Sequence, residues 1–327
     1  MVVSRTKMEV SQRDIERIFR YAGLGEVSHV RVLGAGEFNS VYAVEAGGRR
    51  YALKVGANND AVQRYEKDMM KSELHWYRVT REQTDIRVPA VYFSDFTKSV
   101  IPTNYFIMEY LEGTQKDEMV FTPAQREKAD AVVAGMLARL HRVRGTRYGY
   151  IQCGLHDTWD EALEHMVESL VQDARQVNQP LPQAQRLLRL LDRHRAVLRK
   201  APCRLISFDA WDPNFICVSR DPECPEFVWI DPERCLWGDP VMDFVTMGLG
   251  KWRLGEKKSE MAAYNAFAEF PVTATREEEI RYAFGLCYLA TIMDCEKYYR
   301  YTPELPNWHH NVDFSAFLYT LGFSMLE

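Results

Sequence analysis

Short apolar segments separated by turn residues fill the first third of the chain, and longer segments with helical spacing fill most of the remainder. Residues 30–33, 40–45 and 51–55 predict three strands, with a glycine loop between the first two and a turn between the last two. Residues 89–96 and 105–110 predict two further strands, and residues 11–22 and 61–81 predict helices. Five strands before residue 111, with residues 61–81 as the one main helix, indicate a small lobe built on an antiparallel sheet.

The remaining residues predict a mostly helical lobe. Thr122 before Pro123 is a typical helix start and opens a predicted helix to about residue 143. Thr158 with Glu161 predicts a capping box for the next helix, and residues 183–200 predict a third. Residues 205–208 and 227–230 predict apolar strands, with a third strand at 215–218 as an open alternative. We place a domain boundary near residue 111, between a lobe of residues 1–111 and a helical lobe of residues 112–327.

Composition and charge narrow the class of protein. The 327 residues are 46% hydrophobic and 27% charged, which excludes a mainly disordered or fibrous chain. A net charge of −5 provides no global basic field, so we expect no nucleic-acid partner. No run of 18 apolar residues and no signal-peptide pattern are present, so we expect no membrane association. Seven cysteines without a C-x-x-C pair predict reduced thiols in a cytoplasmic protein, with neither a zinc site nor disulfides.

The glycine loop is the first candidate for chemistry. It lies between two strands, and its candidate ligand-binding residues are Gly34, Gly36, Asn39 and Ser40. Glycines there let the backbone approach a phosphate closely, and successive N–H groups can surround it. No helix follows the loop and no Gly-Lys-Ser/Thr ending is present, which excludes Rossmann and Walker A loops. The alternative is an ordinary hairpin turn.

A lysine in the strand after the glycine hairpin is the second candidate. Lys54 could contact the α- and β-phosphates of a nucleotide if a carboxylate held it in place. Glu73 on the following helix is the natural partner, and Glu66, two turns earlier, remains an alternative. The competing interpretation of Lys54 is a solvated residue at the end of a strand.

Two acidic loops complete the candidate chemistry. Asp209 and Asn214 are five residues apart between apolar strands, the spacing of a kinase catalytic base and a Mg²⁺-binding amide. Asp173 and Asn178 show the same spacing, and we treat that pair as a chance match because no strands flank it. Asp231 ends the next apolar strand, where the main Mg²⁺ ligand of a kinase is expected. Together with the glycine loop and Lys54, these features follow the order of a kinase. They predict an α+β, two-lobed, protein-kinase-like fold.

The sequence resembles the aminoglycoside phosphotransferase family, the small-molecule branch of this fold, over nearly the whole chain. The segments that carry the resemblance are Leu137-Ala138-Arg139-Leu140-His141, Asp209-Ala210-Trp211-Asp212-Pro213-Asn214, Trp229-Ile230-Asp231-Pro232-Glu233 and Gly238-Asp239-Pro240 with Asp243. Asp231 is followed by Pro-Glu rather than Phe-Gly, and no Ala-Pro-Glu anchor follows, which argues against a true protein kinase.

The resemblance implies transfer of the γ-phosphoryl group of ATP or GTP to a hydroxyl of a small molecule. The implied nucleotide-binding residues are Gly34, Gly36, Asn39, Ser40, Lys54, Glu73, Met108, Glu109 and Leu111; the implied Mg²⁺ ligands are Asn214 and Asp231; and the implied catalytic base is Asp209. In this scheme the backbone of residues 109–111 contacts the purine. The first expectation for the acceptor is an aminoglycoside-type or other antibiotic. A metabolic small-molecule kinase and a non-catalytic nucleotide-binding module are the alternatives, and the protein is expected to be a monomer or a homodimer.

Two features qualify the resemblance. The family usually has a histidine two residues before the catalytic aspartate, where this chain has Ser207, so we expect either a less rigid loop or a substitute contact. For Asp239 and Asp243 we expect local structural roles. Residues 155–178 are rich in acids and residues 186–204 are rich in arginines. The acidic segment could attract a cationic acceptor, but mutual neutralisation of the two segments is the favoured interpretation.

Overall fold

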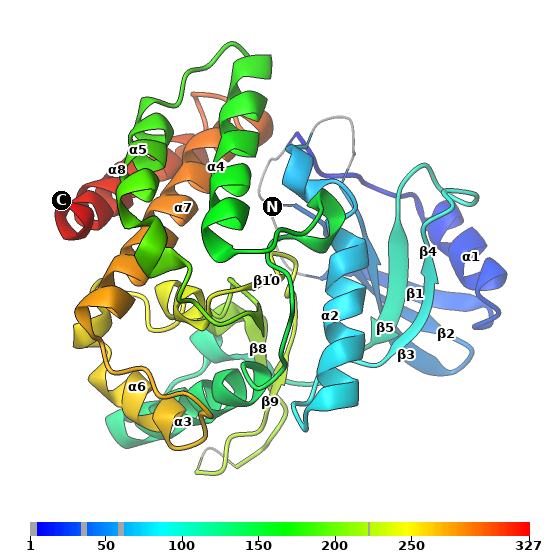
Figure 1. The fold of residues 1–327 in the computed structure, drawn as a ribbon. Coiled ribbons are helices and arrows are strands. Elements are labelled where there is room, and N and C mark those ends of the chain that lie inside the picture. Colours follow the sequence, from blue (N-terminus) through cyan, green and yellow to red (C-terminus); the bar gives the residue numbers. More distant parts are fainter. Residues whose placement is uncertain (1–4, 34–37, 58–61, 222) are drawn as a thin grey trace.

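The computed structural model describes residues 5–33, 38–57, 62–221 and 223–327. Its N-terminal part is a five-stranded antiparallel sheet with strand order β1-β2-β3-β5-β4, and its C-terminal part is mostly helical (Figure 1). The five strands are β1 (Val27–Leu33), β2 (Ser40–Ala46), β3 (Arg49–Val55), β4 (Val91–Asp95) and β5 (Tyr105–Glu109). This arrangement confirms the predicted α+β two-lobed architecture. Gly34 and Gly36 lie outside the described residues.

The sheet has two faces because side chains alternate along each strand. On one face, Leu53 of β3 belongs to a compact apolar cluster with Ile18 and Phe19 of α1 (Gln12–Tyr21), which begins at the predicted cap Ser11. On the other face, Ala52 belongs to the large core that continues into the C-terminal part. Lys54 has the same parity as Ala52, so β3 presents its ammonium to the interior side of the sheet.

The helix predicted at residues 61–81 is wrong at its start. Arg64–Glu66 forms a separate 3₁₀ turn, η2, and α2 (Met69–Gln83) begins only after it. Between them Lys67 is extended and Asp68 has φ of 58°, a left-handed conformation that aspartate tolerates better than most residues. Glu66 and Glu73 therefore do not share a helix face.

The C-terminal part contains six helices among the described residues: α3 (Pro123–Leu140), α4 (Trp159–Gln176), α5 (Pro182–Leu198), α6 (Lys258–Asn265), α7 (Arg276–Arg300) and α8 (Pro306–Leu326). Thr122 caps α3 as predicted, in a reciprocal capping box with Gln125. Helix α4 also begins where predicted, but the Thr158 side chain makes no capping hydrogen bond, so the predicted box with Glu161 is wrong.

Two small sheets carry the loops between these helices. Their strands are β6 (Thr114–Gln115), β7 (Arg204–Ile206), β8 (Phe215–Cys217), β9 (Phe227–Trp229) and β10 (Leu236–Gly238). One sheet pairs β6, β8 and β9, and the other pairs β7 with β10. The open alternative of a strand near residues 215–218 is thereby confirmed. The β8–β9 hairpin packs against α2 through Trp229 and Trp76, whose ring centroids are 5.2 Å apart.

The chain enters the C-terminal part soon after β5. Thr114 of β6 pairs with Cys217 of β8, so residues from 114 onward already belong to the C-terminal sheets. The division into lobes of residues 1–111 and 112–327 stays a prediction. Among the described residues, no helix combines the length and the apolar character that a membrane crossing requires.

Candidate active site

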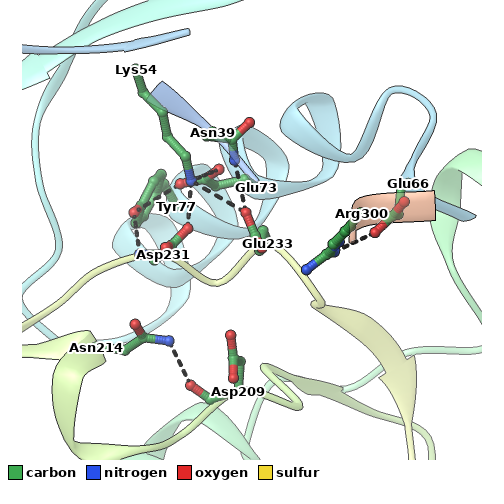
Figure 2. Close-up of polar contacts among 10 residues, drawn as sticks. All are labelled: Asn39, Lys54, Glu66, Glu73, Tyr77, Asp209, Asn214, Asp231, Glu233 and Arg300. Atoms are coloured by element: carbon green, nitrogen blue, oxygen red, sulfur yellow. Dashed lines mark hydrogen bonds and ion pairs between the residues drawn. The ribbon is translucent and has the colours of Figure 1, made fainter. Parts of the chain in front are cut away.

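A buried lysine at the inner face of β3 is the centre of the site. The Lys54 Nζ lies 2.6 Å from Glu73 Oε2 on α2 and 2.5 Å from Asp231 Oδ1 after β9 (Figure 2). Glu233 Oε2 is 3.8 Å away. Of the two partners that the sequence left open, the structure places Glu73 on Lys54. It pairs Glu66 instead with Arg300 of α7.

Two polar side chains that the sequence did not assign to this cluster hold its carboxylates. The Tyr77 hydroxyl donates to Glu73 Oε1 at 3.2 Å and accepts from the backbone N–H of Asp231 at 3.0 Å. Tyr77 was not among the candidate site residues named from the sequence. Its spacing of four residues from Glu73 was the signal for a shared polar contact. Asn39, a predicted ligand-binding residue, donates from Nδ2 to Glu233 Oε2 at 2.8 Å.

The charges in this cluster do not balance. Burial alone would lower the pKa of Lys54, but the carboxylates of Asp231, Glu73 and Glu233 raise it overall, so the ammonium stays charged. Burial raises the pKa of Glu73 to about 7, against the opposing charge of Lys54. The pKa of Glu233 is also raised, first by burial and then by the Asp231 carboxylate. When all three carboxyl groups are ionised, they outnumber the single ammonium, and a divalent cation would neutralise the excess negative charge.

The catalytic-loop candidates lie directly below this cluster in Figure 2. Asn214 Nδ2 donates to the backbone carbonyl of Asp209 at 2.9 Å, and the N–H of Ile230 donates to the carbonyl of Asn214 at 2.9 Å. These bonds place the Asp209 loop beside the strand that ends at Asp231. Burial raises the pKa of Asp209 to about 6; Arg234 opposes the rise and Asp231 adds to it.

The residues present fit a magnesium ion. Because the Asn214 amide nitrogen is used by Asp209, its oxygen is turned toward Asp231 (Figure 2). The Asp231 side chain is 42% exposed and accessible to a ligand. No cluster of three or more His, Cys, Asp or Glu side chains with metal-site geometry occurs in the described parts of the chain. Mg²⁺ suits a site with only the Asn214 and Asp231 side chains as ligands, because it usually takes one or two protein oxygens and completes its coordination shell with phosphate and water.

The backbone of the loop before Asp209 is held by a buried carboxylate, that of Asp243. Asp243 Oδ2 accepts from the N–H of Ser207 at 3.1 Å, and Oδ1 accepts from the N–H of Phe208 at 2.5 Å. His141 Nε2 contacts the same carboxylate at 3.0 Å. Phe208 has φ of 52°, an uncommon conformation that must be held by its surroundings. These contacts confirm the expected structural role of Asp243, whereas the Ser207 hydroxyl is buried without a hydrogen-bond partner in the described part of the chain.

Asp239 also has the local role expected of it. Its carboxylate accepts from the N–H of Val241 and caps η6 (Pro240–Val245), and Arg281 pairs with it at 3.0 Å.

The remaining predicted nucleotide contacts surround the inner face of the sheet. Met108 of β5 is buried and pairs across the sheet with Ala52. The N–H of Glu109 donates to the carbonyl of Ala90 at 2.7 Å, so this amide is not available to a purine. Leu111 is half-buried beyond the end of β5. The Ser40 hydroxyl donates to the carbonyl of Met8 at 2.6 Å, which directs it away from a phosphate role.

The second Asp-x4-Asn pair and the acidic segment of the sequence both lie outside this site. Asp173 accepts from Arg64 at the start of η2, so the second Asp-x4-Asn pair is outside the site. Two acids of α4, Asp160 and Glu164, pair with arginines at α5. The ion pairs that show this are Asp160–Arg195 at 3.2 Å, Asp160–Arg199 at 3.1 Å and Glu164–Arg195 at 2.7 Å. These ion pairs agree with the favoured interpretation, in which the acidic and basic segments neutralise each other, and they need no cationic acceptor to explain the two acids.

Solved structures with this architecture are kinases of the protein-kinase-like fold. A candidate fructosamine-3-kinase from Haemophilus somnus 129PT has a TM-score of 0.65 at 15% identity, with 96% of this chain and 97% of that chain covered. The GDP and kanamycin complex of the aminoglycoside phosphotransferase APH(2″)-IIIa has a TM-score of 0.67 at 13% identity, with 95% and 99% covered. A microcompartment-associated aminopropanol kinase has a TM-score of 0.60 at 19% identity, with 95% and 97% covered. At these identities the likeness establishes the fold.

The family follows from the sequence. The sequence model of the phosphotransferase enzyme family matches residues 29–279, which contain most of β1, the Lys54 cluster and both acidic loops. The chain therefore belongs to the phosphotransferase enzyme family, which confirms the resemblance noted from its motifs. No curated protein sequence matches the chain significantly.

Proposed function

We propose that the protein transfers the γ-phosphoryl group of ATP or GTP to a hydroxyl of a small molecule. The observation that carries this proposal is the convergence of Lys54, Glu73 and Asp231 beside the loop of Asp209 and Asn214. In this scheme Lys54 binds the nucleotide phosphates, and Asn214 and Asp231 hold Mg²⁺, which neutralises phosphate charge when bound. Asp209 accepts the proton of the acceptor hydroxyl. A complete set of these groups argues against a non-catalytic module.

The acceptor that we propose first is an aminoglycoside-type or other antibiotic, with an amino-alcohol or amino-sugar metabolite as the alternative. Kinases with this fold include one solved with kanamycin, one described as a fructosamine kinase and one as an aminopropanol kinase. These three acceptors share a hydroxyl and an amine in one small molecule. A panel should therefore be built around that chemistry.

The proposal is tested by nucleoside diphosphate release across such a panel. Purified protein is incubated with Mg²⁺ and either ATP or GTP, and with aminoglycosides, macrolides, amino sugars or short amino alcohols. We expect one acceptor class to stimulate release by at least tenfold, and mass spectrometry to find that acceptor heavier by one phosphoryl group. Release that no acceptor stimulates, together with no effect of ATP or GTP on the melting temperature, would refute both the kinase assignment and the assigned nucleotide site.

The pH dependence of turnover is expected to report Asp209. A general base works only when deprotonated, and burial raises the pKa of Asp209 to about 6. We expect kcat/KM for the acceptor to be level above pH 7. Below pH 6 it should fall about tenfold per pH unit. Measurements from pH 5 to pH 8, with saturating nucleotide, check this. An unchanged kcat/KM down to pH 5 would contradict a base with this raised pKa.

A further inference from the structure

A cavity of about 340 Å³ lies among the C-terminal helices, outside the Lys54 cluster. Its walls come from the ends of α3 and α5, from β7, from the start of η6, from α6 and from the start of α7. None of the described residues that line it is a candidate for nucleotide, magnesium or base. Small-molecule sites in proteins have volumes of about 300–1,000 Å³. The cavity is therefore large enough for a second small ligand.

The wall of this cavity contains a buried cation without a carboxylate partner. Arg204 of β7 is 8% exposed, and its Nη1 donates to the backbone carbonyl of Cys203 at 2.9 Å. Its Nε and Nη2 form no hydrogen bond or ion pair with any described residue, yet neither atom is sealed from solvent. Burying a charge that nothing balances is costly, so such groups are normally paired. Because Arg204 lines the cavity, its two unused donors suit an anion bound there.

A second arginine adds to this positive surface. Arg281 of α7 lines the same cavity, and its side chain is 11% exposed. Its Nη1 pairs with Asp239 at 3.0 Å, whereas its Nη2 has no described partner and is open to solvent. The other two acids of the wall are also engaged, because Glu269 pairs with Arg144 and Glu278 accepts the capping N–H at the start of α7. The unused charge that the cavity offers is therefore positive.

The remaining wall is apolar next to the arginines. The guanidinium carbon of Arg204 lies 5.1 Å from the centroid of the Phe270 ring, and Pro240 and Pro271 also line the cavity. Guanidinium groups bind carboxylates and phosphates through paired hydrogen bonds. A small organic molecule with one anionic group and an apolar body would match both surfaces.

Hydrogen bonds connect this wall with the catalytic loop. Tyr264 of α6 and His141 both line the cavity, and the Tyr264 hydroxyl is 2.9 Å from His141 Nδ1. His141 Nε2 is 3.0 Å from Asp243, the carboxylate that accepts the N–H groups of Ser207 and Phe208. A ligand that packs against Tyr264 and His141 would restrict their motion, and this restriction would extend to the loop that they support.

We propose that this cavity is an effector site that binds a small organic anion, either a carboxylate or a phosphate monoester, and that its occupancy stabilises the loop before Asp209. Arg204 and Arg281 donate hydrogen bonds to the anionic group, and Phe270 contacts the apolar body. No covalent step is involved. Binding here does not require the proposed phosphoryl transfer, so the failure of one proposal leaves the other standing.

Binding is tested by calorimetry on the full chain with phenyl phosphate, benzoate and neutral benzyl alcohol. We expect one of the two anions to bind at a single site with a Kd below about 1 mM. Benzyl alcohol should bind at least about tenfold more weakly, because it cannot accept charged hydrogen bonds. Tighter binding of phenyl phosphate identifies a phosphate site, and tighter binding of benzoate identifies a carboxylate site. If neither anion binds with such a Kd, the proposal is overturned.

Replacing Arg204 with methionine assigns the binding to this cavity. Arg204→Met should raise the Kd of the preferred anion at least about tenfold, because charged hydrogen bonds are lost. Lys200→Met is the matched control, because Lys200 lines the same cavity but is exposed and pairs with Glu277 at 2.5 Å. Its Kd should change by less than about threefold. An equal Kd in Arg204→Met and the wild type would overturn the site.

Two further variants separate this site from unfolding and from the nucleotide site. Phe270→Ala changes an exposed side chain, so it should fold normally, and it should raise the Kd of the preferred anion at least about threefold. Lys54→Met should keep the anion affinity of the wild type. Loss of anion binding in Lys54→Met but not in Phe270→Ala would place the anion at the Lys54 cluster and overturn the proposal.

Hydrogen exchange followed by mass spectrometry tests the connection to the catalytic loop. Saturating anion should slow exchange in the peptide that contains Ser207 and Phe208 at least about threefold in the wild type. Tyr264→Phe removes the hydroxyl that contacts His141 and keeps the ring. This variant should bind the anion within about threefold of the wild-type Kd and lose the protection. An anion that binds the wild type without slowing exchange in this peptide would overturn the effector role.

Discussion

Replacing Asp209 with asparagine is expected to lower kcat by about 10²–10⁴-fold, the usual contribution of a general base. The substitution should leave the contact between this loop and Asn214 intact, because that contact uses the backbone carbonyl of Asp209 and not its carboxylate. The loop is held independently by Asp243, whose carboxylate accepts two backbone N–H groups next to the base. Loop geometry and nucleotide binding should therefore survive. We expect the Kd for nucleotide to change less than threefold.

The chain offers a matched control for this variant. Asp173 precedes Asn178 by five residues, the same spacing as Asp209 and Asn214. Its carboxylate lies outside the site and accepts a hydrogen bond from the backbone N–H of Arg64. Asp173→Asn should cost some stability and keep turnover within about threefold. Single-turnover kinetics and nucleotide titrations on both variants check the expectation. If Asp209→Asn turns over as fast as Asp173→Asn, the base is a different residue.

Replacing Lys54 with methionine is expected to raise the Kd for nucleotide by about 10–100-fold, because a charged hydrogen bond to phosphate is worth about 1.5–3 kcal/mol. The apo protein should lose stability as well. The structure faces Lys54 with Glu73, Asp231 and Glu233, and removing one partner of a buried ion pair costs about 3–5 kcal/mol. The exposure of Asp231 to solvent reduces that cost.

The stability loss in Lys54→Met should depend on pH in a specific direction. The pKa of Glu73 is already raised to about 7 by burial, and loss of the lysine charge raises it further. A carboxyl whose folded pKa lies above its unfolded value loses stability as pH rises, so the deficit relative to wild type should grow from pH 6 to pH 8. Urea denaturation at the two pH values measures it. A deficit that shrinks over this range would show that Lys54 is not the charge that balances Glu73.

Lys116→Met is the control for the loss of nucleotide affinity. Lys116 is 2% exposed and pairs with Asp130 at 2.6 Å and Asp212 at 2.5 Å, so it resembles Lys54 in burial and charge. It should lose comparable stability and keep its nucleotide affinity. Loss of affinity in both variants would attribute the effect to folding rather than to a phosphate contact.

Much of the architecture could be predicted from local patterns. Strands β1–β5 and β7–β9 and helices α1, α3, α4 and α5 lie close to where apolar spacing, turn residues and caps indicate, because these signals act within a few neighbouring residues. The short strands β6 and β10 were not predicted. The helix at 61–81 is the exception, because the break at Asp68 depends on a left-handed conformation that no local pattern required. The order of the candidate groups along the chain was also sufficient to predict the fold, which the comparison with solved structures confirms.

The sequence by itself therefore determined the fold class, the family resemblance and the candidates Lys54, Asp209, Asn214 and Asp231. Only the tertiary structure decided which groups touch. It selected Glu73 over Glu66, gave Tyr77 a polar role and paired two acids of α4 with arginines. The physical reason is that these contacts join residues far apart in the chain. Lys54 and Asp231, for example, are separated by 177 positions, and burial, not local pattern, sets their pairing and their pKa values.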